Sequence, residues 1–172
     1  MFAEIQFTTF NVEAVLPDYV VRGILRSRGE VLNYLNDRRY PTFSLYDCEL
    51  VPLSSDRKIS TISQELVTID KKRVVVVSVL DESVKDDLHL TISERIVIFY
   101  CGNLAIHGLL HVPADAPDED ILDETKDFFG ITEGSIYSLI PVGAEPHINA
   151  PLMLLNQHAV AAYSVQSGSE RS

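Results

Sequence analysis

The stretch YVVRGILR at residues 19–26 returns as LAIHGLLH at residues 104–111, and this recurrence decides how the rest of the chain is interpreted. Gly23 and Gly108, the flanking apolar residues and the two polar positions of each stretch fall in register. Further matches at offsets of 85 to 89 residues extend over nearly the whole chain. The sequence therefore predicts an internal duplication, with two copies of one structural unit.

Each copy is expected to contain a strand, a hairpin, a short helix, a further strand and a closing hairpin. The first repeat covers residues 3–82 and the second covers 87–168. Alternation along the glycine-bearing strand places Val21 and Leu25 on the core side, together with the glycine between them. A glycine inside a strand loses side-chain packing, so its recurrence predicts a sharp bend or a bulge at the same place in both repeats.

Two segments show the spacing of apolar residues that is typical of helices. Residues 30–39 precede Pro41, which blocks continuation of a helix. Residues 118–128 have Asp118 as the expected N-cap and Gly130 as the expected stop. The sequence therefore predicts one short helix in each repeat.

Each repeat closes with two strands, which we expect to be joined by tight turns at Asp70-Lys71 and Asn156-Gln157. Closure of such a unit into a small barrel or curled sheet removes exposed strand edges. We therefore expect a mainly β (α+β) fold, a tandem duplication of two small Sm-like barrels or curled antiparallel sheets, each with one short helix. The strands of one repeat can also complete the sheet of the other.

The glycine-bearing strand, the leucine-containing helix, the proline-ended strand and the closing pattern "Leu-x-x-Asn/Asp-x-x-x-Val" resemble a bacterial family of small duplicated β-barrel domains with no assigned function. The resemblance covers nearly the whole chain and implies a fold, without catalytic residues. More distantly, the chain is similar to Sm-like RNA-binding barrels. The RNA-contacting Asn and Arg-Gly signatures of that family are not in the matching places, since Arg22-Gly23 lies in a different strand.

Composition indicates a globular, soluble protein. Of the 172 residues, 46% are hydrophobic, and the longest apolar runs fall far short of the roughly 20 residues that span a bilayer. The first residues carry an acid where a signal peptide is basic, so we expect a cytoplasmic protein without membrane contact. Cys48 and Cys101 belong to no metal-binding or redox motif and are interpreted as two reduced core thiols.

The charge is divided unevenly along the chain, whose net charge is −11. Residues 1–82 contain ten Lys and Arg against twelve Asp and Glu, whereas residues 83–172 contain four against thirteen. Nucleic-acid binding depends largely on Lys and Arg that neutralise phosphates, so the acidic total disfavours a nucleic-acid partner. The basic residues of the first repeat remain a possible binding face.

The histidines provide weak evidence for a metal site. His107 and His111 share a strand face at a separation of about 13 Å, at ~3.3 Å per residue, too far apart for one metal to bridge directly. They occupy the positions of Arg22 and Arg26 in the first repeat, so they are interpreted as replaced surface cations. We predict no metal and no cofactor.

No catalytic motif is found: the sequence lacks Gly-x-Ser-x-Gly and any glycine-rich phosphate loop, and we expect a protein that is not an enzyme. The main hypothesis is a non-catalytic interaction or assembly module with a protein partner or self-association, as in a homo-oligomer. Alternatives are a single-stranded nucleic-acid binder that uses the basic face of the first repeat, and a small-molecule or metal site between the repeats. The candidate binding residues are Arg22, Arg26, Arg39, Lys71, Lys72, Arg73, His107 and His111, with Gly23 and Gly108 as structural residues.

Overall fold

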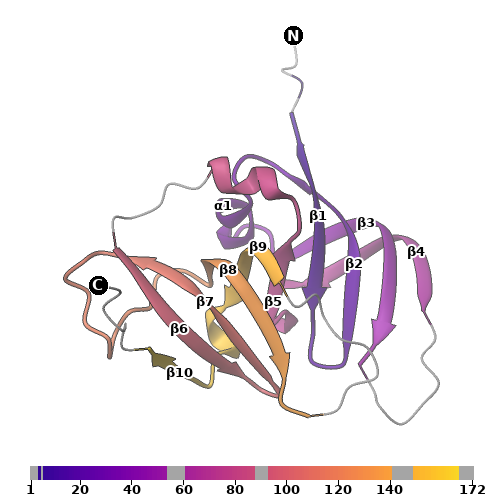
Figure 1. Cartoon of the computed structure of the whole chain (residues 1–172). Helices are drawn as coiled ribbons and strands as arrows, with labels where there is room; N and C mark the ends of the chain where they lie inside the picture. The colour runs from indigo at the N-terminus through magenta and orange to yellow at the C-terminus, as the bar shows by residue number, and fades with distance from the viewer. Residues whose placement is uncertain (1–3, 5, 54–60, 88–92, 141–148, 167–172) are drawn as a thin grey trace.

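The computed structural model describes residues 4, 6–53, 61–87, 93–140 and 149–166, and the described strands form one antiparallel sheet of ten strands (Figure 1). The first half of the chain contains β1 (Thr8–Val15), β2 (Tyr19–Ser27), α1 (Val31–Asn36), β3 (Thr42–Pro52), β4 (Ile62–Asp70), the 3-10 helix η1 (Lys71–Arg73), β5 (Val76–Val79) and the 3-10 helix η2 (Glu82–Asp87). The second half contains β6 (Ser93–Cys101), β7 (Leu104–Val112), β8 (Phe128–Ser138), β9 (Asn149–Asn156), the 3-10 helix η3 (Gln157–Ala159) and β10 (Ala162–Val165).

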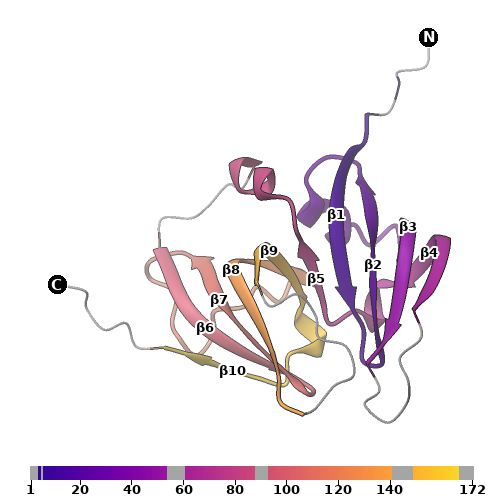
Figure 2. The ribbon, with the colours of Figure 1, turned by 45° about the vertical axis from the view of Figure 1, so that its right-hand side comes forward.

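The strands of the two halves follow the same order within the sheet. The full order is β10-β6-β7-β8-β9-β5-β1-β2-β3-β4, so each half places its last strand beside its first and then continues in chain order. The halves meet where β9 pairs with β5. Figure 2 shows the resulting two groups of strands side by side. Thus, a strand of one half does extend the sheet of the other.

Backbone hydrogen bonds recur at corresponding positions, by which we mean residues of the two halves that are related by the offsets of the sequence repeat. The Val75 N–H donates to the Val15 carbonyl at 2.8 Å, and the Ala161 N–H donates to the Tyr100 carbonyl at 2.9 Å. These bonds fix the start of β5 against β1 and the start of β10 against β6 in the same way. The expected start of the first repeat, residue 3, lies outside the described residues. The expected start of the second, residue 87, is the last residue of η2, and residues 88–92 after it lie outside the described residues.

The predicted bulges are confirmed. The pairing of β2 with β3 shifts register beside Gly23, and the pairing of β7 with β8 shifts register beside Gly108. The bulged partner strands place Asp47 and Glu133 at positive φ, 51° and 50°. A Cβ on Gly23 would lie 2.9 Å from the Tyr46 carbonyl oxygen, so the two strands approach too closely for any side chain.

The helix predictions are confirmed in the first half and wrong in the second. α1 occupies part of the predicted 30–39 segment, but the described residues 113–127 form turns, without the helix that Asp118 was expected to cap. Gly130 lies within β8 instead of ending a helix. The Asp123 carboxylate accepts bonds from the Thr125 N–H and hydroxyl at 2.9 and 2.6 Å. Such local bonds compete with helical ones, which explains the turn.

The predicted closing hairpins are wrong, because the strands on either side of Asp70 and Asn156 do not pair with each other. β4 pairs with β3, whereas β5 pairs with β1 and β9. The Asp70 side chain accepts the Lys72 N–H and the Asn156 side chain accepts the His158 N–H, each at 3.0 Å. These caps start η1 and η3, and each 3-10 helix directs the chain away from its preceding strand.

The apolar side chains form two clusters of buried residues, one centred on each half. Cys48 belongs to the first cluster and Cys101 to the second; both are free thiols, as the sequence predicted. Burial raises the pKa of the Cys101 thiol to about 11, so this cysteine stays protonated and unreactive at neutral pH. Within the described residues, the structure contains no helix that is long and apolar enough to cross a membrane.

Alanine at the bulge glycines should destabilise the fold. We expect Gly23→Ala and Gly108→Ala each to lower the free energy of unfolding by about 1–3 kcal/mol, because the new methyl group overpacks the strand crossing. Gly130→Ala is the matched control, since its nearest neighbour would lie at an ordinary 3.4 Å. Urea unfolding of the three variants measures this, and equal stabilities would contradict the close approach at the bulges.

Candidate functional site

The structure does not gather the eight candidate binding residues into one patch. They are spread over β2 (Arg22, Arg26), the connection between α1 and β3 (Arg39), η1 (Lys71, Lys72, Arg73) and β7 (His107, His111). A binding surface for a polyanion would need these charges on one continuous face. The sequence showed the spacing of these residues along the chain, but it did not show how the elements that carry them would be arranged in space.

The two arginines of β2 contact neighbouring strands. The Arg22 Nε donates to Glu13 Oε2 at 2.7 Å, and the Glu13 side chain is completely buried. The Arg26 guanidinium lies over the Tyr46 ring, 3.9 Å from its centroid, in cation–π geometry. Arg22 therefore neutralises a buried carboxylate of β1, which is a structural role.

Lys71 and Arg39 surround the end of α1. Lys71 is only 8% exposed, and its Nζ donates to the carbonyls of Tyr34 and Asp37 at 3.3 and 3.1 Å. Burial lowers the pKa of this lysine. The Arg39 side chain hydrogen-bonds to Asp37 and lowers the pKa of that carboxyl to about 2. Lys71 thus caps α1, and its ammonium group is turned inward.

The two histidines of β7 do not lie between the halves, because β8 and β9 separate β7 from β5 in the sheet. The His111 Nε2 and the Thr132 hydroxyl share a hydrogen bond of 2.7 Å. Among the described residues, no group of three or more His, Cys, Asp or Glu side chains could hold a metal ion. The geometry therefore offers no support for assigning His107 and His111 to a site between the halves.

The two halves contact each other through the end of α1. The Arg38 side chain donates to the Asp127 carboxylate at 3.1 and 3.3 Å, and His158 Nε2 lies 3.0 Å from the same carboxylate. Asn36 donates to the Phe128 carbonyl at 2.9 Å and accepts the Phe128 N–H at 2.7 Å. One basic residue of the first half, Arg38, therefore pairs with an acidic residue of the second half.

The main connection between the halves is the pairing of β5 with β9, which we call the seam. It runs from the pair Val76 and Leu155 to the pair Val79 and Leu152. Val79 and Leu152 belong to the first core cluster, whereas Val76 and Leu155 belong to the second. The seam is therefore buried on both faces of the sheet, where unpaired backbone groups would be costly.

Asn156 closes one end of the seam. Its N–H donates to the Val75 carbonyl at 3.0 Å. Its side-chain amide donates to the Val74 carbonyl at 2.9 Å and to the Lys71 carbonyl at 3.5 Å, and the residue is only 2% exposed. A single residue of the second half thus donates to three carbonyls around η1 in the first half, one through its backbone and two through its side chain.

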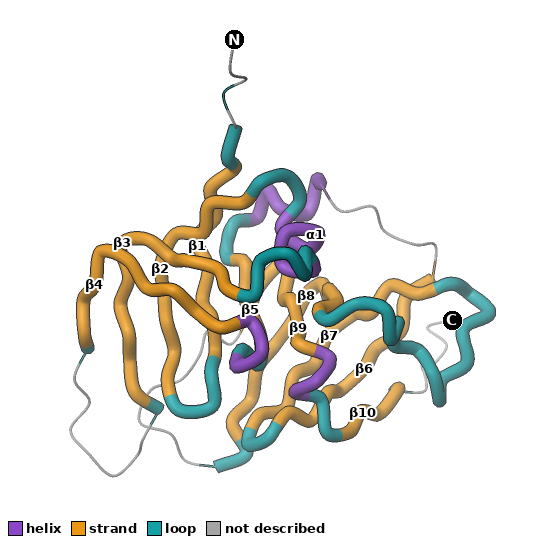
Figure 3. The backbone as a smooth tube through the Cα atoms, turned by 180° about the vertical axis from the view of Figure 1, so that it is seen from behind, coloured by secondary structure: helices purple, strands orange, loops and turns teal. Residues whose placement is uncertain are grey.

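Among the described strands, the outermost ones, β4 and β10, each pair with one neighbour only. They lie at opposite ends of the sheet, as the view from behind shows (Figure 3). β4 carries two exposed apolar side chains, Ile62 and Leu66, which are 47% and 52% exposed. An edge strand with unpaired backbone groups and apolar side chains is a template for pairing with another chain.

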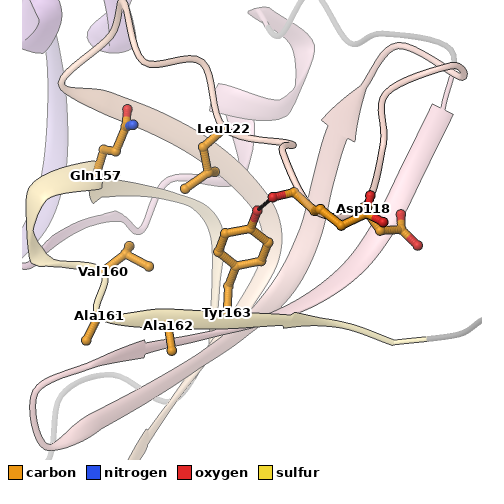
Figure 4. A pocket seen from close by; sticks show the side chains of 8 residues that line it. Asp118, Leu122, Gln157, Val160, Ala161, Ala162 and Tyr163 are labelled. Atoms are coloured by element: carbon orange, nitrogen blue, oxygen red, sulfur yellow. Dashed lines mark hydrogen bonds between the residues drawn. The ribbon is translucent and has the colours of Figure 1, made fainter.

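An open cavity of about 520 Å³ lies beside β10 (Figure 4) and is lined by Asp118, Glu119, Leu122, Gln157, Val160, Ala161, Ala162 and Tyr163. Three of these residues, Gln157, Val160 and Ala161, correspond to the three residues whose carbonyls bind Asn156 at the seam. In the first half this place is filled by the second half of the same chain. In the second half it is open to solvent.

An exchange of strands between the repeats was expected, but not that β5 and β9 form the contact, although a signal for it is present in the repeat alignment. The last residues of β4 read LVTID at 66–70, whereas the corresponding residues of β9 read LMLLN at 152–156. From Val67 to Asp70, β4 alternates apolar and polar side chains, as expected for a strand with one wet face, but β9 is apolar on both faces. Comparing the repeats with each other would have indicated which strand is internal.

Neutralising Asp127 should loosen the contact between the halves in a pH-dependent way. The hydrogen bond from His158, followed by that from Arg38, lowers the pKa of Asp127 below its ordinary value of 3.8. The carboxylate therefore stabilises the fold above that value, and this contribution is lost as pH falls through the lowered pKa. We expect Asp127→Asn to cost up to about 1 kcal/mol at pH 7, since the pair is partly exposed.

The measurement is thermal unfolding from pH 7 to pH 2, with the exposed Asp120→Asn as the control. The stability difference between wild type and Asp127→Asn should shrink as the pH falls below 3.8. A difference that stays constant over this range, or one equal to that of the control, would contradict an ionic contact at Asp127.

Known proteins do not assign this arrangement a role. Comparisons of the chain with family models, with curated proteins and with solved structures find no match. The features that bear on function are therefore the seam, the two free edges and the cavity beside β10.

Proposed function

We propose that this protein is a non-catalytic assembly module that self-associates through the free edges of its sheet. The observation that carries the proposal is the pair of outermost strands, β4 and β10, each of which pairs with a described strand on one side only. The exposed side chains of Ile62 and Leu66 on β4 add apolar surface at one of these edges. Backbone pairing at an edge and burial of such side chains together provide the free energy of strand addition.

The proposed architecture behind this function is a tandem duplication of two small Sm-like barrels, each made of five strands. Support comes from the identical strand order of the halves and from bulges at Gly23 and Gly108. The caps by Asp70 and Asn156 at the start of η1 and η3 provide further support. In such a duplicated chain, each barrel has two strand edges, and one edge of each is used at the seam.

The nucleic-acid alternative has less support from the geometry. Arg22 is paired with the buried Glu13, Arg39 with Asp37, and Lys71 is turned inward. We expect no binding of labelled mixed-sequence single-stranded RNA, even at low salt, because three of the six candidate cations are engaged within the chain and the net charge of −11 repels a polyanion. Fluorescence anisotropy at low and physiological salt measures this. Binding that weakens steeply with salt would instead favour the nucleic-acid reading.

Self-association should depend on the β4 edge. We expect the mass of the wild type in solution to rise above the 19.2 kDa of one chain as concentration increases. Leu66→Lys should remain near the mass of one chain, since a charge on an edge strand opposes further pairing. Leu139→Lys is the matched control, because Leu139 is 56% exposed but lies outside the edge strands.

Light scattering coupled to size-exclusion chromatography measures these masses over a range of concentrations. A wild type that keeps the mass of one chain at every concentration would contradict self-association. Equal effects of the Leu66 and Leu139 substitutions would show that general surface charge, and not the β4 edge, controls the assembly.

A further inference from the structure

The two free edges of the sheet are the counterparts of the two strands that form the seam. β4 corresponds to β9, and β10 corresponds to β5, both at an offset of 86 residues. We propose that β4 of one copy pairs antiparallel with β10 of the next copy and thereby repeats the seam between molecules. The inference rests on the proposed function, because it names the partner, a second copy of this chain, and the contact.

The seam supplies the register of this contact. Within the chain, Val76 pairs with Leu155 and the pairing continues antiparallel to Val79 and Leu152. Transferring each residue to its counterpart gives four pairs between copies. These pairs are Ala162 with Ile69, Tyr163 with Thr68, Ser164 with Val67, and Val165 with Leu66.

Backbone groups are directed correctly for this register. The residue after β10 donates its N–H to the Ile96 carbonyl in β6 at 2.8 Å. N–H groups alternate between the two sides of a strand, so those of Tyr163 and Val165 point away from β6. Lys71, the residue after β4, donates its N–H to the Pro41 carbonyl at 3.0 Å, on the side of β3. By the same alternation, the N–H groups of Thr68 and Leu66 point away from β3. The outward residues are those that the register places opposite each other.

The same contact covers Leu66, one of the exposed apolar side chains of β4. The counterpart of Leu66 is Leu152, which is 2% exposed because the seam buries it, whereas Leu66 is 52% exposed. The counterpart of Asn156 is Asp70, which would enter the cavity beside β10. A second copy thus fits the edge and the cavity together.

The contact between copies should be weaker than the seam. The Asn156 side chain donates to the carbonyls of Val74 and Lys71, whereas an ionised Asp70 has no hydrogen to donate. The Asp118 and Glu119 side chains also line the cavity that Asp70 would enter. This difference makes the contact between copies reversible while the seam stays closed.

The proposed pairing joins two different edges, so it is heterologous and head-to-tail. Such contacts close into a ring when the rotation between copies allows it, and they otherwise form an open filament. A symmetric pairing of β10 with β10, or of β4 with β4, would instead stop at a dimer.

The register can be tested by disulfide formation between two variants of the full chain. Ser164→Cys and Val67→Cys are purified separately, mixed and oxidised, because their Cα atoms would lie at the short distance of about 4.5 Å that suits a disulfide. The native Cys48 and Cys101 are 2% and 3% exposed and should not react. Glu65→Cys replaces Val67→Cys in the control mixture. Glu65 is on the same face of β4 as Val67 but about 7 Å further along the strand, so its distance from Ser164 would be longer than a disulfide allows.

We expect a mixed disulfide dimer in the first mixture, at least about tenfold more abundant than in the control, since cysteines more than about 7 Å apart do not bridge. Crosslinks between two copies of Ser164→Cys would overturn the proposal in favour of a symmetric dimer. An assembly that is detected by its mass but gives no mixed disulfide would also overturn it, while leaving the proposed function intact. A chain that stays monomeric would contradict both the β4–β10 pairing and the proposed function.

Asp70→Asn provides a gain-of-function test, because it gives the β4 edge the side chain that closes the seam. The new amide can still accept the Lys72 N–H, as Asn156 accepts the His158 N–H. We expect the dissociation constant of the assembly to fall by about fivefold, the worth of one net hydrogen bond. Asp18→Asn, an exposed change of the same charge, is the control. Equal constants for the two variants would overturn the placement of Asp70 in the cavity.

Discussion

Pairing of β5 with β9 is the interaction on which the rest of this structure depends. It joins two five-strand groups into one sheet and is covered by apolar side chains on both faces. Because no water reaches these backbone groups, each hydrogen bond that is broken there leaves a costly unsatisfied partner. The short length of β5, four residues, is compensated by Asn156, which adds side-chain bonds to two carbonyls beyond the strand.

The parts of the fold that follow from local sequence were predictable. The bulges at Gly23 and Gly108 could be inferred because a glycine among core positions has no packing role of its own. The burial of Cys48 and Cys101 followed from their strand contexts. The helix expected near residue 118 was wrong, because helical spacing of Ile121 and Leu122 does not outweigh the local bonds that Asp123 makes.

The parts that depend on contacts between the halves were not predictable from one strand at a time. Lys71 resembled a surface cation in the sequence, yet two carbonyls at the end of α1 accept hydrogen bonds from its ammonium group. Gln157 occupies the corresponding position, and its side-chain amide, once oriented to donate, reaches the carbonyls of Asp123 and Lys126. The two residues hold different local structures, a helix end and a turn, by the same kind of contact. Only the folded arrangement shows that both side chains bind backbone carbonyls.

The covalent connection between the halves also determines how an assembly can grow. Two halves on separate chains would have to find each other at their bulk concentration, whereas two halves on one chain meet at an effective concentration in the millimolar range. The seam therefore forms at any expression level, and in the proposed assembly only the contact between free edges responds to the amount of protein. For a given number of halves, this reduces the number of bimolecular encounters by about half. The threshold for assembly then depends on the weaker of the two junctions alone.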